Sequence, residues 1–569
     1  MDTVIVTGAQ AEMTVPARGR ISFLGVLRIT VAALGGLQAI AARNSMNVDG
    51  MSYIDVARAY ANGDWAGAIN GYWSPLYSWL VAAVMLVLDP SPQHEFAAVH
   101  ALNFCLFLFA LVAFEFFLRE LFITLESGQA RRESKPGRAW WALGYSLFAY
   151  ASLVLTNLGH VGPDILLCAW LYLSAGILIR VARDREVSLV RAVALGATMA
   201  AGYLTKSVMF PLSLVVFGTA VVLVARKRLS LAGLLVSAAV FVFVAGPWIL
   251  ALSEAKGRFT SGDSGKLNYA WWVDNVRMFR HWQGDPVHGT PLHATRPLST
   301  GPVIYEFAEP VRGTYPVWYD ASYWYDGVRV SLKPSLELHR LANSVEDYLG
   351  QEWFYPALVG LLVLYLSVGN AGLRRTVQSN WFVLVPAAAG LFLYALARVL
   401  GRYVAPFVVI GLLTLLTGMG LRVPRNRADG SGIDDRTAAV LAAVFGLMVI
   451  SQLWFKDRKV PRGHMHLAVA ARLAELGVPP GSRLGVIGES SNAYWAHLAG
   501  DRIVAEITPD ESGWFWAQTA DQRTRDLELF RLPQAVAVVA DNVPQWADRS
   551  GWVPVGEGGY WLMRLRSSP

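Results

Sequence analysis

Long apolar runs separated by short polar connections fill most of this sequence up to residue 455. A helix needs about 20 residues to cross a bilayer, because each residue rises only about 1.5 Å, and the runs are near that length. The pattern therefore predicts eleven membrane-spanning helices. They are expected at 21–42, 97–118, 140–156, 165–182, 190–204, 207–225, 230–252, 352–370, 380–398, 403–421 and 437–455.

One further segment, 74–88 (SPLYSWLVAAVMLVL), is apolar but short. If it does not cross, most Lys and Arg of the connections fall on one side, in the loops 119–138, 180–191, 226–228, 373–378 and 422–436. Cytoplasmic loops of membrane proteins carry such an excess of positive charge. We therefore expect 74–88 to lie along the outer surface or to dip part way into the membrane.

This topology divides the chain into regions. Residues 1–20 form a cytoplasmic N-terminus without the features of a cleavable signal peptide. Residues 21–455 form the membrane domain, which includes a first extracytoplasmic loop at 43–96 and a large one at 253–351. The tail 456–569 is also extracytoplasmic. Strand-like RLGVIG, RIVAEI, AVAVVAD and YWLMRL alternate there with helix-like stretches, which predicts a small α/β domain.

Composition agrees with this fold class, a polytopic α-helical membrane protein of the inner cell membrane. Of 569 residues, 54% are hydrophobic and 16% are charged, whereas soluble proteins carry about 25% charged residues. The net charge of +7 belongs to cytoplasmic loops, so we expect membrane lipid and no nucleic acid as a partner. Both cysteines, Cys105 and Cys168, lie in apolar runs, which argues against a disulfide framework.

Polar and ionisable residues gather at span ends that share the predicted outer side. They are Asp49 in VDGMSYIDVARAY, Asp164 in GHVGPDILL, Lys206 in LTKSVMFP, and Arg398, Arg402 and Tyr403 in ARVLGRYVAP. Ionisable groups at membrane depth are costly, so they face a cavity or find a partner. Singly, the cations could snorkel to the interface and the acids could cap helices. Their convergence from four connections favours a shared site. Helical spacing places Asp55 facing away from Asp49, so we expect Asp55 to tolerate replacement by Asn far better.

These motifs resemble the GT-C class of integral-membrane glycosyltransferases. The resemblance is strongest to bacterial relatives of the protein O-mannosyltransferases, a group that includes the aminoarabinose transferases of lipid A. In that class an acid in the first outer loop precedes a tyrosine and a surface helix, and VDGMSYIDVARAY is similar to this element. The next element of the class is a proline-rich start to a second surface helix, which NGYWSPLYSW resembles. The Thr-Lys turn and the Arg-Tyr-x-x-Pro turn are similar to LTKSVMFP and GRYVAP. This chain departs from the class at Gly50, where many relatives have Glu, and at Ser207, where Gly is common.

The resemblance implies a polyprenyl-phosphate sugar donor and a lipid, glycan or protein acceptor. Asp49 is then expected to be the general base that removes the proton of the acceptor hydroxyl. Lys206 and Arg402 are expected to bind the donor phosphate, with Arg398 as a further candidate. Tyr403 donates to the phosphate or orients Arg402, and Asp164 holds the acceptor or tunes Asp49.

Other features leave alternatives open. The aromatic side chains of the loop 253–351 could pack on sugar rings. Trp and Tyr are also enriched at membrane interfaces, and we favour that interpretation of this loop. His160 is expected to be a local hydrogen-bonding residue. No metal-binding spacing occurs, so no cofactor is predicted, and a weakly bound divalent cation stays open.

A transporter or flippase of lipid-linked sugars is the rival function, but the chain shows no internal repeat and its charges cluster on one side. An inactive scaffold would need no such charges.

Overall fold

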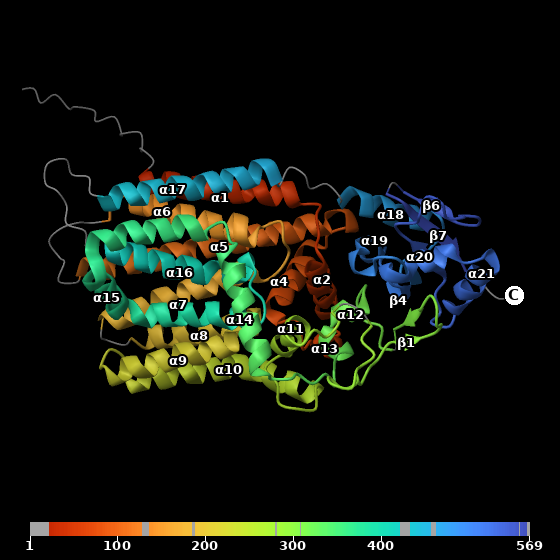
Figure 1. Cartoon of the computed structure of the whole chain (residues 1–569), viewed down its shortest axis with the longest axis horizontal. Helices are drawn as coiled ribbons and strands as arrows, with labels where there is room; N and C mark the ends of the chain where they lie inside the picture. Colours follow the sequence, from red (N-terminus) through yellow and green to blue (C-terminus); the bar gives the residue numbers. More distant parts are fainter. Residues whose placement is uncertain are drawn as a thin grey trace, which may run out of the picture.

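The computed structural model describes residues 22–127, 136–184, 188–278, 281–307, 309–420, 433–456, 463–556 and 558–565. Long helices lie side by side in a bundle, a small sheet lies beyond one end of it, and α2, α4, α11 and α12 lie between (Figure 1). The predicted N-terminal segment 1–20 and parts of three predicted cytoplasmic loops, 128–135, 185–187 and 422–432, lie outside the described residues.

Within the described residues each predicted span overlaps a helix, with bounds that differ by a few residues. The bundle consists of α1 (Phe23–Ala42), α5 (Pro92–Ser127), α6 (Arg138–Tyr150), α7 (Asp164–Asp184), α8 (Leu189–Thr205), α9 (Met209–Ala225), α10 (Leu231–Ala255), α15 (Phe354–Ala395), α16 (Gly401–Gly420) and α17 (Ile433–Ser451). Among the described helices, eight are long and apolar enough to cross a membrane, and α4, α8 and α9 are shorter apolar helices. Bundle side chains such as Phe243, 81% exposed, face outward. An apolar outer face of this kind suits contact with lipid.

Two of the predicted spans are joined in α15. Its backbone leaves helical geometry at Gly369, with φ 62° and ψ −172°, and at Asn380. Glycine reaches positive φ without the steric cost that a Cβ brings. The chain therefore bends between the predicted spans 352–370 and 380–398, and Figure 1 shows this bend at the end of the bundle away from the sheet.

The predicted first outer loop, 43–96, folds into short helices, as expected. They are α2 (Val48–Ala61), α3 (Trp65–Ala68) and α4 (Pro75–Leu88). Pro75 stands at the first position of α4, where its missing N–H costs nothing. With 14 residues, α4 extends about 21 Å, less than the ~30 Å thickness of the hydrocarbon core. This length supports a helix that does not cross.

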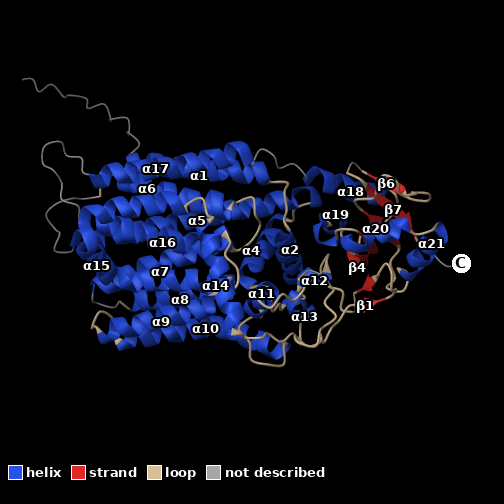
Figure 2. Cartoon of the chain, viewed as in Figure 1, coloured by secondary structure: helices blue, strands red, loops and turns tan. Residues whose placement is uncertain are grey.

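The C-terminal region contains the predicted strands in a mixed seven-stranded sheet (Figure 2). Parallel strands β4 (Arg502–Ile507), β3 (Arg483–Ile487) and β5 (Ala537–Ala540) form its centre. Nearly every residue in these three strands is buried, as the apolar runs of central parallel strands require. The antiparallel strands β7 (Tyr560–Arg564) and β6 (Val553–Val555) extend one edge.

The other edge of the sheet comes from the loop 253–351, the predicted large outer loop. Strands β1 (Arg296–Pro297) and β2 (Tyr305–Glu306) pair there, and β2 runs antiparallel to β4. The same loop forms α11 (Ser264–Trp272), α12 (Pro316–Tyr319), α13 (Ala321–Trp324) and α14 (Pro334–Leu349). Helices α18 (Gly463–Glu475), α19 (Tyr494–Ala499), α20 (Pro509–Ala517) and α21 (Ala520–Leu529) complete the C-terminal region. Both predicted outer regions thus share one sheet, and the predicted fold class, a helical bundle with a small C-terminal α/β domain, is confirmed.

Candidate active site

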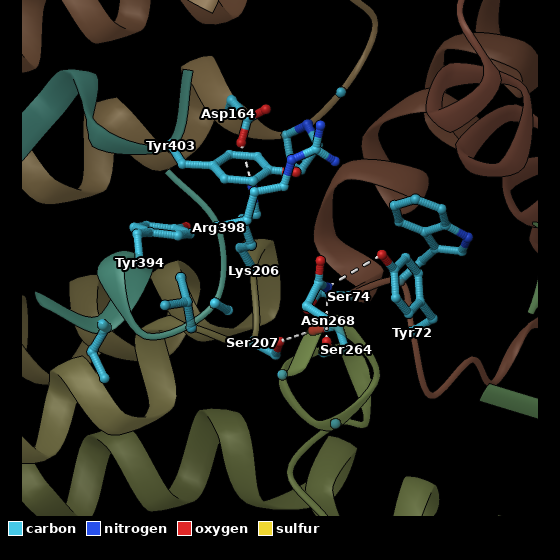
Figure 3. A pocket seen from close by; sticks show the side chains of 18 of the residues that line it. Tyr72, Ser74, Asp164, Lys206, Ser207, Ser264, Asn268, Tyr394, Arg398 and Tyr403 are labelled. Carbon is cyan, nitrogen blue, oxygen red and sulfur yellow. Dashed lines mark hydrogen bonds and ion pairs between the residues drawn. The ribbon is translucent and has the colours of Figure 1, made fainter. Parts of the chain in front are cut away.

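A cavity of about 370 Å³ opens between the end of the bundle and the outer-loop helices. All six residues singled out from the sequence line it: Asp49, Asp164, Lys206, Arg398, Arg402 and Tyr403. They come from α2, from the start of α7, from the end of α8, from the turn between α15 and α16 (Arg398) and from the first turn of α16 (Arg402 and Tyr403). In Figure 3, Asp164, Tyr403, Lys206 and Arg398 lie close together, with Tyr72 and Asn268 across the cavity from them.

Asp49 lies in the first turn of α2, and its neighbours fix that turn. The Asn47 side chain accepts a hydrogen bond from the Val161 N–H at 2.8 Å and donates to the Val161 carbonyl at 3.1 Å. This pairing fastens the start of α2 to the segment that leads into α7. Asp49 Oδ2 accepts a hydrogen bond from Arg402 Nη2 at 2.9 Å and lies 3.6 Å from His160 Nε2.

The structure explains why Gly follows Asp49. A Cβ at residue 50 would lie 2.7 Å from both the Met46 sulfur and the Val161 Cβ. Real Cβ atoms are not found so close to their neighbours, so any larger residue would push these groups apart. The Glu that many relatives of the resembled class carry next to the first acid does not fit here, and Asp49 is the acid that this turn presents.

Asp164 holds the two cations that the sequence assigned to phosphate. Its Oδ1 accepts a hydrogen bond from Lys206 Nζ at 2.6 Å, and its Oδ2 lies 3.7 Å from Arg402 Nε. The Asp164 side chain is only 5% exposed. Arg402 therefore lies between both carboxylates, and the charged groups form one connected network rather than separate surface pairs.

Tyr403 contacts two cations of the same network. Its hydroxyl accepts a hydrogen bond from Arg402 Nη2 at 3.2 Å, and Lys206 Nζ lies 3.8 Å from its ring centroid. Arg398 is different, because its guanidinium stacks on Trp272 at 3.7 Å from the ring centroid. Arg398 forms no ion pair with any other residue that the structure describes. The aromatic ring holds its charge in the cavity without neutralising it.

Burial and neighbouring charges set the protonation of two further groups. Burial lowers the pKa of His160 to about 4, and the Arg402 cation beside it acts in the same direction. His160 is therefore neutral near pH 7. Burial also disfavours the charged form of Lys206, but the Asp164 carboxylate more than offsets this and holds the pKa of the ammonium above its usual value. With His160 neutral, three cations and two carboxylates line the cavity.

Several polar residues of the cavity were missed from the sequence. Tyr72 accepts a hydrogen bond from Asn268 Nδ2 at 3.3 Å, and the hydroxyls of Ser207 and Ser264 lie 2.6 Å apart (Figure 3). Ser264 and Asn268 belong to α11, in the large loop, where the only sequence signal was aromatic content. Within the described residues, no group of three or more His, Cys, Asp or Glu side chains is placed to hold a metal ion.

No protein-family model and no curated protein sequence matches the chain. Its structure is similar to that of the oligosaccharyltransferase from Archaeoglobus fulgidus in the apo form, with a TM-score of 0.51 and 14% identity, covering 90% of this chain and 69% of that one. The chain has a GT-C fold. It is also similar to ArnT from Cupriavidus metallidurans in the apo state, with a TM-score of 0.48 and 14% identity, covering 91% of this chain and 92% of that one. At this identity the likeness to the archaeal enzyme establishes the fold alone, so the function has to be argued from the cavity.

Proposed function

We propose that this protein is a membrane glycosyltransferase that moves a sugar from a polyprenyl-phosphate donor to a hydroxyl acceptor at the outer face of the cell membrane. The observation that carries the proposal is the charge arrangement of the cavity, in which Arg402 lies between Asp49 and Asp164 and Lys206 pairs with Asp164. The archaeal protein with the same fold is itself an oligosaccharyltransferase.

The cations suit the leaving phosphate. Arg398 has its charge unpaired within the described part of the chain, and Lys206 and Arg402 stand beside it in the same cavity. The excess of one positive charge matches a sugar phosphodiester, which carries a single negative charge. As the bond between the sugar and the phosphate breaks, negative charge grows on the phosphate, and cations held in place stabilise that charge in the transition state.

Asp49 suits the role of general base. The acceptor oxygen attacks the anomeric carbon, the bond from that carbon to the phosphate oxygen breaks, and the electron pair stays on the phosphate. The proton of the acceptor hydroxyl passes to Asp49. A bound phosphate competes with Asp49 for Arg402, so donor binding releases the carboxylate that has to accept this proton.

Asp164 and Tyr403 take positioning roles in this proposal. Asp164 is buried and occupied by Lys206, so it orients the cations, and we do not assign it to the acceptor. Tyr403 orients Arg402 and supports Lys206. This division differs from the sequence-based expectation that Asp164 holds the acceptor or tunes Asp49.

Binding of undecaprenyl phosphate to the purified protein tests the phosphate site without knowledge of the sugar. We expect saturable binding that weakens by about tenfold or more in Arg398→Ala, since one charged hydrogen bond contributes about 1.5–3 kcal/mol. Arg226→Ala, a basic residue away from the cavity, is the matched control and should bind like the wild type. If Arg398→Ala bound undecaprenyl phosphate as tightly as Arg226→Ala, Arg398 would not be part of the phosphate site.

A further inference from the structure

A second buried charge cluster lies where the C-terminal region meets α2. His497, on α19, places Nδ1 2.8 Å from Asp55 Oδ1 on α2 and Nε2 3.1 Å from Glu95 Oε2 on α5. The His497 side chain is 0% exposed. Phe96 stacks beside its ring. None of these residues lines the donor cavity, so the cluster is separate from the proposed transfer chemistry.

The remaining partners complete the charge count of this cluster. Arg58 Nη2 pairs with Glu95 Oε2 at 2.7 Å, and Arg58 Nη1 donates to the His497 carbonyl at 3.3 Å. The Thr314 N–H and hydroxyl both donate to Asp55, at 2.7 and 3.1 Å. Two carboxylates and one guanidinium leave one buried negative charge. Such a charge is costly unless it is paired, and only an imidazolium form of His497 pairs it.

The cluster is connected to Asp49 through α2. Asp55 and Asp49 are on the same short helix, α2. The segment that leads into α19, with Ser490, Ser491 and Ala493, surrounds a small space together with Val48, Met51 and Ser52. The C-terminal region thus faces the turn of α2 that carries the proposed base across this small space.

We propose that His497, as an imidazolium held between Asp55 and Glu95, locks the C-terminal region onto α2 and thereby positions Asp49. Its effect on sugar transfer rests on the proposed function, whereas the docking itself does not. His497 is a positioning residue, because it acts through α2 and touches no substrate.

The lock has a defined dependence on pH. Burial and Arg58 act to lower the pKa of His497, but the Glu95 and Asp55 carboxylates outweigh them, so this pKa is raised above its ordinary value. A group with a raised pKa contributes its full stabilisation below its unfolded-state pKa and loses it as pH rises through the folded-state pKa. Docking should therefore be complete at pH 6 and weaken progressively on the alkaline side.

The first test uses charge balance. His497→Gln leaves the negative charge uncompensated, and kcat should fall by about tenfold or more, since small misplacements of catalytic groups are that costly. Binding of undecaprenyl phosphate should stay unchanged. The double variant His497→Gln/Glu95→Gln removes one carboxylate as well and should recover most of the lost rate. Failure of Glu95→Gln to rescue would contradict the charge-balance argument.

The closing experiment measures docking directly in the full-length protein. Ala493 is 4% exposed, so Ala493→Cys, in a background without Cys105 and Cys168, should react with a charged maleimide much more slowly than the exposed Val287→Cys at pH 6. The ratio of the two rates, taken at each pH because the thiolate is the reacting form, should rise with pH. With His497→Gln this ratio should be high at every pH, and adding Glu95→Gln should lower it again. A ratio that stays low and unchanged with pH while His497 is intact would overturn the lock, even if the His497 variant does not fold. Expected labelling without sugar transfer would refute the proposed function and leave the lock standing.

Discussion

Replacement of Asp49 by Asn should separate sugar transfer from donor binding. Asn keeps the size of the side chain and its place in the first turn of α2, but it cannot accept the acceptor proton. Loss of a general base costs about 10²–10⁴ in rate. We therefore expect kcat to fall by at least about a hundredfold.

The same change should leave donor binding intact or tighten it. In the unliganded site Arg402 Nη2 is bound to Asp49 Oδ2 at 2.9 Å, and a phosphate has to compete for that guanidinium. A hydrogen bond to a charged group contributes about 1.5–3 kcal/mol, and Asp49 is partly exposed, so only a fraction is recovered. Undecaprenyl phosphate should bind up to about tenfold more tightly, which corresponds to about 1.4 kcal/mol.

The assay pairs radiolabelled sugar transfer in membranes with titration of the purified protein by undecaprenyl phosphate. Asp89→Asn is the matched control, because Asp89 is exposed and left-handed at φ 41°, a conformation that Asn tolerates well. Asp89→Asn should behave as wild type in both measurements. Donor binding that is lost in Asp49→Asn would refute the reasoning, because Asp49 would then be part of the phosphate site or of the fold.

Three further outcomes are expected. Lys206→Ala and Arg402→Ala should each lower transfer by about a hundredfold, with Arg402→Lys recovering only part of it because a point charge cannot reproduce the planar fork; wild-type rates in both alanine variants would leave them as interfacial residues. The pKa of His160 falls to about 4 in the folded protein, so stability should decline from pH 6.5 toward pH 4, and His160→Gln should flatten that decline in thermal unfolding; an unchanged profile would contradict the assigned protonation. A membrane-impermeant maleimide should label Val287→Cys but not Arg226→Cys from outside; the reverse would invert the topology.

Much of the fold could be predicted because the bilayer imposes length and charge rules on the sequence. Apolar runs of near-spanning length located the helices, and loop charge predicts that α4 does not cross. The bend at Gly369 was anticipated only as a gap between two spans. Strands β3, β4, β5 and β7 were recognisable as apolar runs in the tail, whereas β1 and β2 are two residues each and depend on pairing with β4.

The site was predictable where ionisable residues stand at membrane depth, since such residues need a reason to be there. Asp49, Asp164, Lys206 and Arg402 do line one cavity. Which cation pairs with which acid was not predictable, because it depends on side-chain geometry that sequence spacing does not contain. Arg398 became a stronger candidate for phosphate binding only because the structure shows it stacked on Trp272 without an acidic partner among the described residues.

Asp55 shows the limit of argument from helix spacing. It lies on α2 away from Asp49, as expected, and this position alone suggested a substitution-tolerant control. The structure instead buries Asp55 against Thr314 and His497, two residues that are far from it in sequence. Removing its charge would disturb the packing of the C-terminal region, so Asp55 is unsuitable as a neutral control.

An experimental structure of the protein with a bound polyprenyl phosphate tests the central claim most directly. The account predicts that the phosphate lies within hydrogen-bonding distance of Arg398 and Arg402, close to Lys206, with the Asp49 carboxylate no longer bound to Arg402. A phosphate bound outside this cavity, with the Asp49–Arg402 pair intact, would contradict it.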